Sequence, residues 1–303
     1  MPDPVRSPGR PCAVALALAC LVSLAPRGPA RAEPPPAARY AWLESRGAVE
    51  SPPASAPLRE RFPAPEGFRR RPGGPFATWL RGLPLLPGRP PVRLFDGTPK
   101  AGSDVHAAVL DIDVGRRDLQ QCADAVIRLR AEYLYAVGCE DAIRFDFTSG
   151  DPAPWPQWRD GARPRVRGSR VTWHAGSPAD RSWRNLRRYL DTVFTYAGSS
   201  SLERELERVE DPRTARPGDV FIQGGFPGHA VLVIDVVHDD RGEARMLLAQ
   251  SYMPAQQIHV LRNPESPGSP WYAARASGPL QTPEWAFRYA DLHRFPEVGC
   301  PGP

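Results

Sequence analysis

The sequence lacks the short motifs that mark the commonest metal and nucleotide sites. It contains no H-E-x-x-H segment, no closely spaced cysteine pairs of the zinc-binding kind, no Walker phosphate loop and no G-x-G-x-x-G segment. We therefore expect no metal, no nucleotide and no other cofactor.

Lysine is nearly absent, since Lys100 is the only one, and arginine supplies almost all of the formal net charge of +5. Four of the 39 basic residues and one of the 34 acidic residues fall in residues 1–32. Without that segment 35 basic and 33 acidic residues remain, which is a net charge of +2. A balance this even is not the electrostatic footprint of a nucleic-acid-binding protein, so we expect no nucleic-acid partner.

Long hydrophobic runs are also missing. The apolar run at residues 12–25 has 14 residues, fewer than the ~20 that cross a membrane. Arginines precede this run and Ala30-Arg31-Ala32 follows it, which predicts a secretory signal peptide over residues 1–32, cleaved before Glu33. We therefore expect an exported protein, periplasmic or extracellular. An uncleaved anchor and a lipoprotein attached through Cys20 are the less favoured alternatives.

Cysteine is scarce, with five in the chain. Cleavage of the signal peptide would leave Cys122, Cys139 and Cys300. An odd number leaves at least one thiol free or paired between chains. A bridge between Cys139 and Cys300 would make Cys122 the free thiol.

The remaining chain divides by composition. Residues 33–57 are rich in proline and alanine and predict a linker, in which residues 40–43 could dock on the domain. Residues 58–298 predict a single α+β domain with long proline-rich loops, and residues 299–303 form a tail. No internal repeat is visible.

The most informative stretch runs from Pro217 to Leu261. After a Pro-Gly-Asp turn it predicts three successive strands, at Val220–Gln223, Ala230–Val237 and Met246–Tyr252. Two polar residues interrupt the apolar pattern: His229 follows Gly228, and Gln250 lies within the third strand. A buried imidazole or amide is costly without a partner, so we interpret the pair as a catalytic base and its orienting residue.

The nucleophile is predicted on a helix over residues 118–136. Asp118 is the expected cap, with Gln121 three residues later. One face is formed by apolar or small residues, namely Leu119, Cys122, Val126, Leu129 and Tyr133. Cys122 would thus lie in the first turn, where the helix dipole and a nearby imidazolium favour a thiolate that alkylates below pH 8.

Each of these residues also has a structural interpretation. Cys122 could be a small core residue, His229 could cap a turn, and Gln250 could satisfy a bulge. His106 is a rival base. Trp155 and Trp158, in a loop predicted over residues 149–169, could stack on sugar rings of a substrate or could pin the loop to the domain.

Four runs of the sequence closely resemble the bacterial family called domain of unknown function 4846. They are AVLDIDVG at 108–115, QCADAVIRLRAEYL at 121–134, GDVFIQGG at 218–225 and AQSYMPAQ at 249–256. The resemblance extends over about residues 60–295 and implies an exported bacterial protein.

A weaker resemblance comes from the order of the motifs. A Cys-bearing helix, a Pro-Gly-Asp strand, a Gly-His strand and a strand with a third polar residue are similar to papain-like domains of the NlpC and CHAP types. The resemblance implies an antiparallel sheet against the Cys-bearing helix, here with inserted helices, and a cysteine hydrolase with Cys122 as nucleophile, His229 as base and Gln250 as orienting residue. The expected substrate is an amide in a cell-envelope peptide, such as peptidoglycan. The alternative is a non-catalytic envelope protein that binds a peptide or glycan in an aromatic cleft, or has a structural role.

Overall fold

The computed structural model describes residues 1–2, 40–46, 56–102 and 104–299. The helices and strands fall within one compact unit, Ala38–Pro303. Nearly all of the predicted signal peptide, with Cys20, and the predicted bridge partner Cys300 lie outside the described residues. Among the described helices, none combines the length and the apolar character that a membrane crossing requires.

Seven α-helices and three short 3₁₀ helices are present in the described part of the chain. The α-helices are α1 (Ala41–Arg46), α2 (Leu58–Arg61), α3 (Pro75–Arg81), α4 (Cys122–Ala136), α5 (Trp155–Arg159), α6 (Trp183–Tyr196) and α7 (Ser199–Glu205). The 3₁₀ helices are η1 (Glu140–Ala142), η2 (Pro212–Thr214) and η3 (Tyr289–Asp291).

The strands form one large antiparallel sheet and three small hairpins. The large sheet has the order β1 (His106–Val109), β10 (His259–Leu261), β9 (Ala244–Gln250), β8 (His229–His238), β7 (Val220–Gln223), β14 (Leu292–Arg294) and β6 (Glu207–Arg208), with β11 (Tyr272–Ala273) also paired to β9. The hairpins are β2 (Arg144–Asp146) with β3 (Pro152–Pro154), β4 (Ala162–Arg167) with β5 (Arg170–Ala175), and β12 (Pro279–Gln281) with β13 (Ala286–Arg288). The predicted α+β class is confirmed, and the three predicted strands are β7, β8 and β9.

Strand β8 has core on both of its faces, as its continuous apolar run predicts. Ala230, Leu232 and Ile234 belong to the core that contains α4, whereas Val231 and Val233 belong to a second core on the other face. A bulge in the pairing with β9, between Val233 and Asp235, then exchanges the faces. Asp235 is fully buried there, and its carboxylate accepts hydrogen bonds from Arg70 and Arg81, each at 2.7 Å.

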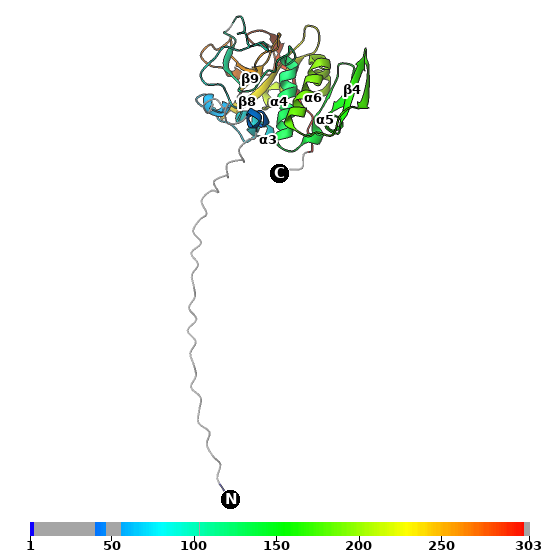
Figure 1. Cartoon of the computed structure of the whole chain (residues 1–303). Helices are drawn as coiled ribbons and strands as arrows, with labels where there is room; N and C mark the ends of the chain where they lie inside the picture. The colour runs from blue at the N-terminus through cyan, green and yellow to red at the C-terminus, as the bar shows by residue number, and fades with distance from the viewer. Residues whose placement is uncertain (3–39, 47–55, 103, 300–303) are drawn as a thin grey trace. The chain divides into compact units, whose positions relative to one another are not determined.

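Helix α4 lies between β8 and helix α6 (Figure 1). The sequence predicts burial of one face, but every residue from Cys122 to Leu134 is buried. The ionisable residues on the helix therefore need partners. Arg128 pairs with Asp113 at 2.6 Å, and Glu132 accepts a hydrogen bond from the Trp183 indole of α6 at 2.8 Å. Helix α4 is thus the central element of the core.

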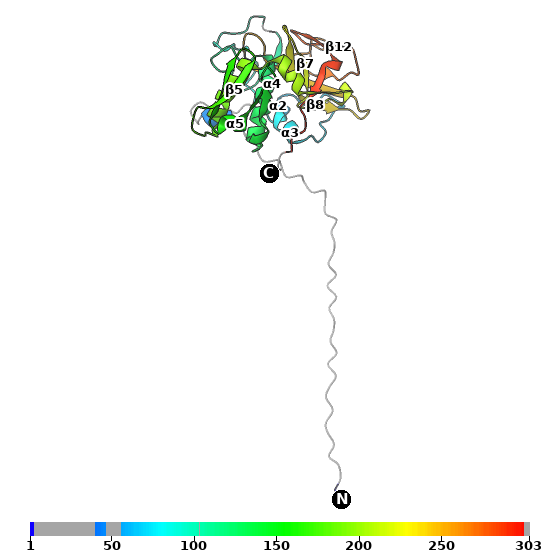
Figure 2. The same cartoon turned by 90° about the vertical axis from the view of Figure 1, so that its right-hand side faces the viewer.

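Three segments differ from the prediction. The expected loop at residues 149–169 contains β3, α5 and β4, and Figure 1 shows α5 and β4 on the far side of α6 from the sheet. Figure 2 shows α5 beside β5, the partner of β4. Residues 92–95, whose sequence Val-Arg-Leu-Phe predicts a short strand, make only isolated bridges. The proline-rich C-terminal region contains β14, which inserts between β7 and β6 in the large sheet. Short strands with exposed alternate residues, such as β12 and β13, give little hydrophobic pattern.

Helix α1 lies within the predicted linker. Trp42 is buried, and its indole N–H donates to the Asp111 carbonyl at 2.7 Å. Its ring packs against Tyr40 and Trp79, with centroid distances of 5.0 and 5.9 Å. The expected docking of residues 40–43 is therefore confirmed.

Candidate active site

Cys122 is the first residue of α4, because the helix is capped one residue before it. The backbone N–H of Gln121 donates to the Asp124 carboxylate at 3.0 Å, and the Gln121 side chain accepts from the Asp124 N–H, which completes a capping box. The predicted cap at Asp118 is wrong. Asp118 instead accepts hydrogen bonds from the Ala255 N–H at 2.7 Å and from the Gln121 amide at 3.1 Å.

The thiol of Cys122 lies against the beginning of β8. Cys122 is 8% exposed, and the backbone N–H of Ala230, the residue after His229, donates a hydrogen bond to its sulfur. Burial, together with the nearby charge of Asp124, raises the pKa of the thiol to about 11. The expected thiolate at neutral pH is therefore wrong for this structure, because the loss of hydration outweighs the helix dipole and the N–H donors.

His229 and Gln250 form the predicted pair. The ring nitrogen Nε2 of His229 lies 2.9 Å from the Gln250 side-chain oxygen, and both side chains are 1% exposed. The imidazole is surrounded by the rings of Tyr252, Trp285 and Phe287, whose centroids lie 4.9, 5.2 and 5.8 Å away. Burial lowers the pKa of His229 to about 4, against the opposing effect of the Gln250 hydrogen bond.

His229 and Gln250 belong to a hydrogen-bond network that ends at the carboxylate of Glu284. This carboxylate determines which group donates in each hydrogen bond of the network. Glu284 pairs with the Lys100 ammonium at 2.7 Å and accepts a hydrogen bond from Gln250 Nε2 at 2.8 Å. A carboxylate can only accept, so the Gln250 NH₂ group faces Glu284 and its oxygen faces His229. The His229 Nε2 must then carry the proton, and Nδ1 is left with its lone pair.

A second histidine agrees with this assignment. His259 Nδ1 lies 2.9 Å from the Gln257 carbonyl, which can only accept, so Nδ1 carries the proton and Nε2 is an acceptor. That Nε2 lies 3.5 Å from Gln250 Nε2, in the direction of its second N–H. Each hydrogen-bond donor around Gln250 thus faces an acceptor, and this pattern holds for only one orientation of the Gln250 amide.

A cavity of about 180 Å³ opens beside Cys122. Its wall includes Phe226, which is 97% exposed, and Met253, which is 51% exposed. Gly228 lines it from the turn before His229. A Cβ atom at Gly228 would lie 2.2 Å from the Ser199 hydroxyl and 2.7 Å from the Gln223 carbonyl, so only glycine allows this turn to approach α7 so closely. Cys122, Phe226 and Met253 thus line the same cavity.

Other candidates from the sequence lie elsewhere. Trp155 and Trp158 are 0% and 6% exposed, with their indole N–H groups bonded to Glu140 and Asn185, so they hold the α5 region together and do not form a sugar-stacking surface. His106, the rival base, lies on β1, which β10 and β9 separate from β8, and its Nε2 bonds to the Pro90 carbonyl at 2.9 Å.

Sequence reasoning missed four residues that complete the site: Lys100, Tyr252, Glu284 and Trp285. The isolated lysine in an arginine-rich chain was a signal for Lys100. Tyr252 was expected only as the end of the third strand, and Glu284 and Trp285 lie in a loop without a hydrophobic pattern. In the described part of the chain, no group of three or more His, Cys, Asp or Glu side chains is arranged to hold a metal ion.

Residues 58–294 match a protein family described as Domain of unknown function (4846). The chain belongs to this family. The match includes Cys122, His229, Gln250 and Glu284, so the whole network lies within the family domain. No curated protein and no solved structure matches the chain. The family description names no activity, so the function has to be argued from the site.

Proposed function

We propose that this protein is an exported cysteine hydrolase that cleaves an amide bond in the bacterial cell envelope, with a peptidoglycan peptide as the first substrate to test. We further propose that its α+β fold is of the papain-like kind found in NlpC and CHAP domains. The supporting order is a Cys-bearing helix followed by adjacent antiparallel strands β7, β8 and β9, with His229 and Gln250 on the last two.

The observation that carries the proposal is the direction of the hydrogen bonds around Gln250. Glu284 orients the amide, the amide holds the proton on His229 Nε2, and Nδ1 keeps the lone pair that a general base needs. The same bond also satisfies a buried imidazole, and the tautomer that it fixes is the one that leaves Nδ1 unprotonated. The sulfur of Cys122 accepts a hydrogen bond from the backbone of the residue after His229, so it lies at the same end of β8 as the proposed base.

The chemistry then follows from the groups present. His229 Nδ1 takes the thiol proton as the Cys122 sulfur attacks the amide carbonyl carbon, and the C–N bond breaks as the same nitrogen returns the proton to the leaving amine. The acyl group is left on sulfur as a thioester. Water, deprotonated by His229, then attacks the thioester and releases a carboxylic acid and the thiol.

The resting pair is neutral. With the thiol pKa at about 11 and the imidazole pKa at about 4, a thiol and an uncharged imidazole coexist between these limits. Proton transfer therefore costs free energy in the empty site, and the attraction between the thiolate and imidazolium offsets part of that cost. The pair thus favours concerted proton removal during attack over a preformed ion pair.

One observation favours the alternative of a non-catalytic envelope protein. The same burial that makes the pair neutral also makes Cys122 resemble a core residue, and the exposed Phe226 on the cavity wall could contact a ligand without any bond cleavage. The proposed export rests on residues 1–32, and N-terminal sequencing of the exported protein should find Glu33 or a close neighbour. A chain that stays in the cytoplasm and keeps Met1 would contradict the export proposal.

The deciding experiment measures the amino groups released from purified peptidoglycan by the chain that begins at Glu33. Cys122→Ala and His229→Ala should each abolish release, and Gln250→Ala should reduce it. The matched control is His174→Ala, which removes an exposed histidine on β5 and should leave release unchanged. Acid quenching of the wild type should trap an acyl group on Cys122, detected by mass spectrometry. No release by the wild type, with unchanged binding in Cys122→Ala, would leave the non-catalytic alternative.

A further inference from the structure

A second cavity lies away from Cys122. It has a volume of about 1040 Å³ and is lined by residues of α3, the Pro217-Gly218-Asp219 turn, the middle of α4 and the segment after β14. Arg130 on its wall is eight residues after Cys122, which is about 12 Å along the axis of α4. We call this cavity the arginine cleft, and it is independent of the proposed hydrolase site.

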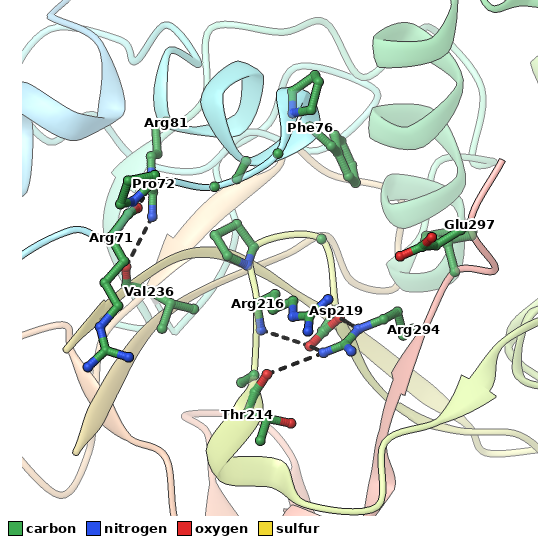
Figure 3. Close-up of a pocket in the computed structure, with 18 of the residues that line it drawn as sticks. Arg71, Pro72, Phe76, Arg81, Thr214, Arg216, Asp219, Val236, Arg294 and Glu297 are labelled. Carbon is green, nitrogen blue, oxygen red and sulfur yellow. Dashed lines mark hydrogen bonds and ion pairs between the residues drawn. The ribbon is translucent and has the colours of Figure 1, made fainter. Parts of the chain in front are cut away.

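Six arginines line the arginine cleft, and three of them are paired with carboxylates. Arg294 forms two hydrogen bonds of 2.7 Å with Asp219, Arg81 pairs with Asp235 at 2.7 Å, and Arg213 pairs with Asp211 at 2.9 Å. Figure 3 shows Arg294 beside Asp219, with Arg216 next to them and Phe76 on the opposite side. In the described part of the chain, Arg71, Arg130 and Arg216 form no ion pair with a carboxylate. Glu297 is the remaining acidic residue on the wall.

Arg130 is the most informative of the three. It is 9% exposed, and its guanidinium lies 5.1 Å from the ring centroids of both Phe76 and Phe295 and 5.7 Å from that of Tyr133. In the described part of the chain its guanidinium forms no hydrogen bond and no ion pair, and the residue lines the cleft. Aromatic stacking holds a planar cation in place and leaves its in-plane N–H groups for a ligand.

The Pro-Gly-Asp turn builds this arrangement. A Cβ atom at Gly218, where φ is +101°, would lie 2.7 Å from the Phe76 ring, so glycine allows Phe76 to pack directly on the turn. Asp219 is 1% exposed and also accepts a hydrogen bond from the Arg216 N–H at 2.8 Å. The turn thus fixes both the ring that supports Arg130 and the backbone that carries Arg216.

We propose that the arginine cleft binds a small molecule or peptide end that bears an oxyanion, a carboxylate or a phosphate, beside an apolar portion. The oxyanion would take the in-plane donors of Arg130, with Arg216 as the second cation, because a guanidinium presents paired N–H groups that match two oxygens. The apolar portion would contact Phe76 and Phe295. The volume is that of a site for a ligand of drug size.

Isothermal titration calorimetry at constant ionic strength tests this with three probes that share a benzene ring. Phenyl phosphate and N-benzoylglycine carry the two oxyanions, and N-benzoylglycinamide is the neutral match. At least one anionic probe should bind the wild type at least tenfold more tightly than the neutral amide. The preferred anion assigns the ligand to a phosphate or a carboxylate source, and either preference supports the proposal.

Variants locate the binding. Arg130→Gln should weaken the preferred probe at least tenfold, and Arg130→Lys should recover only part of the loss because lysine lacks the planar fork. Arg213→Gln is the control, since Arg213 lines the same cleft but is already paired with Asp211. Arg216 is exposed, so Arg216→Gln should fold even if Arg130→Gln does not, and it should weaken binding several-fold. Equal affinity for the amide, no binding, or equal losses in Arg213→Gln and Arg216→Gln would overturn the proposal.

Discussion

The side-chain NH₂ group of Gln250, on β9, donates a hydrogen bond of 2.8 Å to the carboxylate of Glu284, which lies in the loop between β12 and β13. This contact also fixes the tautomer of the His229 imidazole. Because the Gln250 NH₂ group already donates to Glu284, the amide presents its oxygen to His229. Lys100 in turn holds the carboxylate at 2.7 Å. The site is therefore a directional chain of four side chains, and its direction can be tested without a substrate.

Glu284→Gln should disturb the histidine tautomer. A glutamine at position 284 can donate as well as accept, so the Gln250 amide can turn and offer either group to His229. Nitrogen NMR of histidine-labelled protein should show a single Nε2-protonated neutral tautomer for His229 in the wild type and a mixture in Glu284→Gln. Glu265→Gln is the control, because Glu265 forms an exposed pair with Arg275 at 2.7 Å. An unchanged tautomer in Glu284→Gln would contradict the assigned direction.

Alkylation of Cys122 should be slow in the native protein at neutral pH. With a thiol pKa of about 11, the thiolate is about one part in a thousand at pH 8. The rate with iodoacetamide should rise about tenfold per pH unit towards pH 10 and should be much faster at pH 8 after denaturation. Mass spectrometry of the labelled peptide measures it. Cys139 is in a disulfide, so in the described part of the chain Cys122 is the free thiol. Rapid native labelling below pH 8 would mean that a thiolate pair forms.

The free energy of unfolding should decrease in acid because His229 is buried in its neutral form. The folded pKa of about 4 lies below the ordinary value of 6.5, so the unfolded chain binds a proton more readily between these limits. The contribution of His229 is fully present above pH 6.5 and decreases as the pH falls to about 4, by about 3 kcal/mol in total. His229→Gln should remove this loss.

The measurement compares urea unfolding of wild type and His229→Gln from pH 7 to pH 4.5. The informative quantity is the difference in unfolding free energy between the two proteins at each pH, because Asp124 changes the stability of both proteins with pH in the opposite direction. Burial raises the pKa of Asp124 to about 8, so its contribution decreases as the pH rises from about 4 to 8 in both proteins. Parallel curves for the two proteins would mean that His229 is not buried in its neutral form.

The sequence predicted the parts of the site that lie on regular elements. Strands β7 to β9 and helix α4 have strong hydrophobic patterns, and the polar residues that interrupt them, His229 and Gln250, are bonded to each other as expected. The pattern could not give the thiol pKa, because burial of Cys122 depends on how the loops around the N-terminus of α4 pack. The same pattern could not show that α4 is covered on all sides.

The missing residues have a common physical reason. Glu284 and Trp285 lie between β12 and β13, in a region of short strands and prolines where neither period 2 nor period 3.6 can be recognised. Their place beside His229 depends on contacts between residues more than 50 positions apart, such as the bond from the Trp285 indole to Gln223. Composition gave one signal, the single lysine. For the tryptophans, pinning of the loop was the favoured alternative, and the burial of Trp155 and Trp158 agrees with it.

Helix α1 should contribute to the stability of the domain. Trp42→Ala would leave a cavity against Tyr40 and Trp79 and would remove the hydrogen bond to the Asp111 carbonyl, and it should lower the free energy of unfolding by about 3–5 kcal/mol. Trp42→Phe keeps most of the ring volume but loses the hydrogen bond of 2.7 Å, so the loss should be about 1–3 kcal/mol. Ser45→Ala, on the exposed side of the same helix, should change stability by less than about 0.5 kcal/mol. Urea unfolding measures all three, and equal stabilities would mean that residues 40–46 act only as a linker.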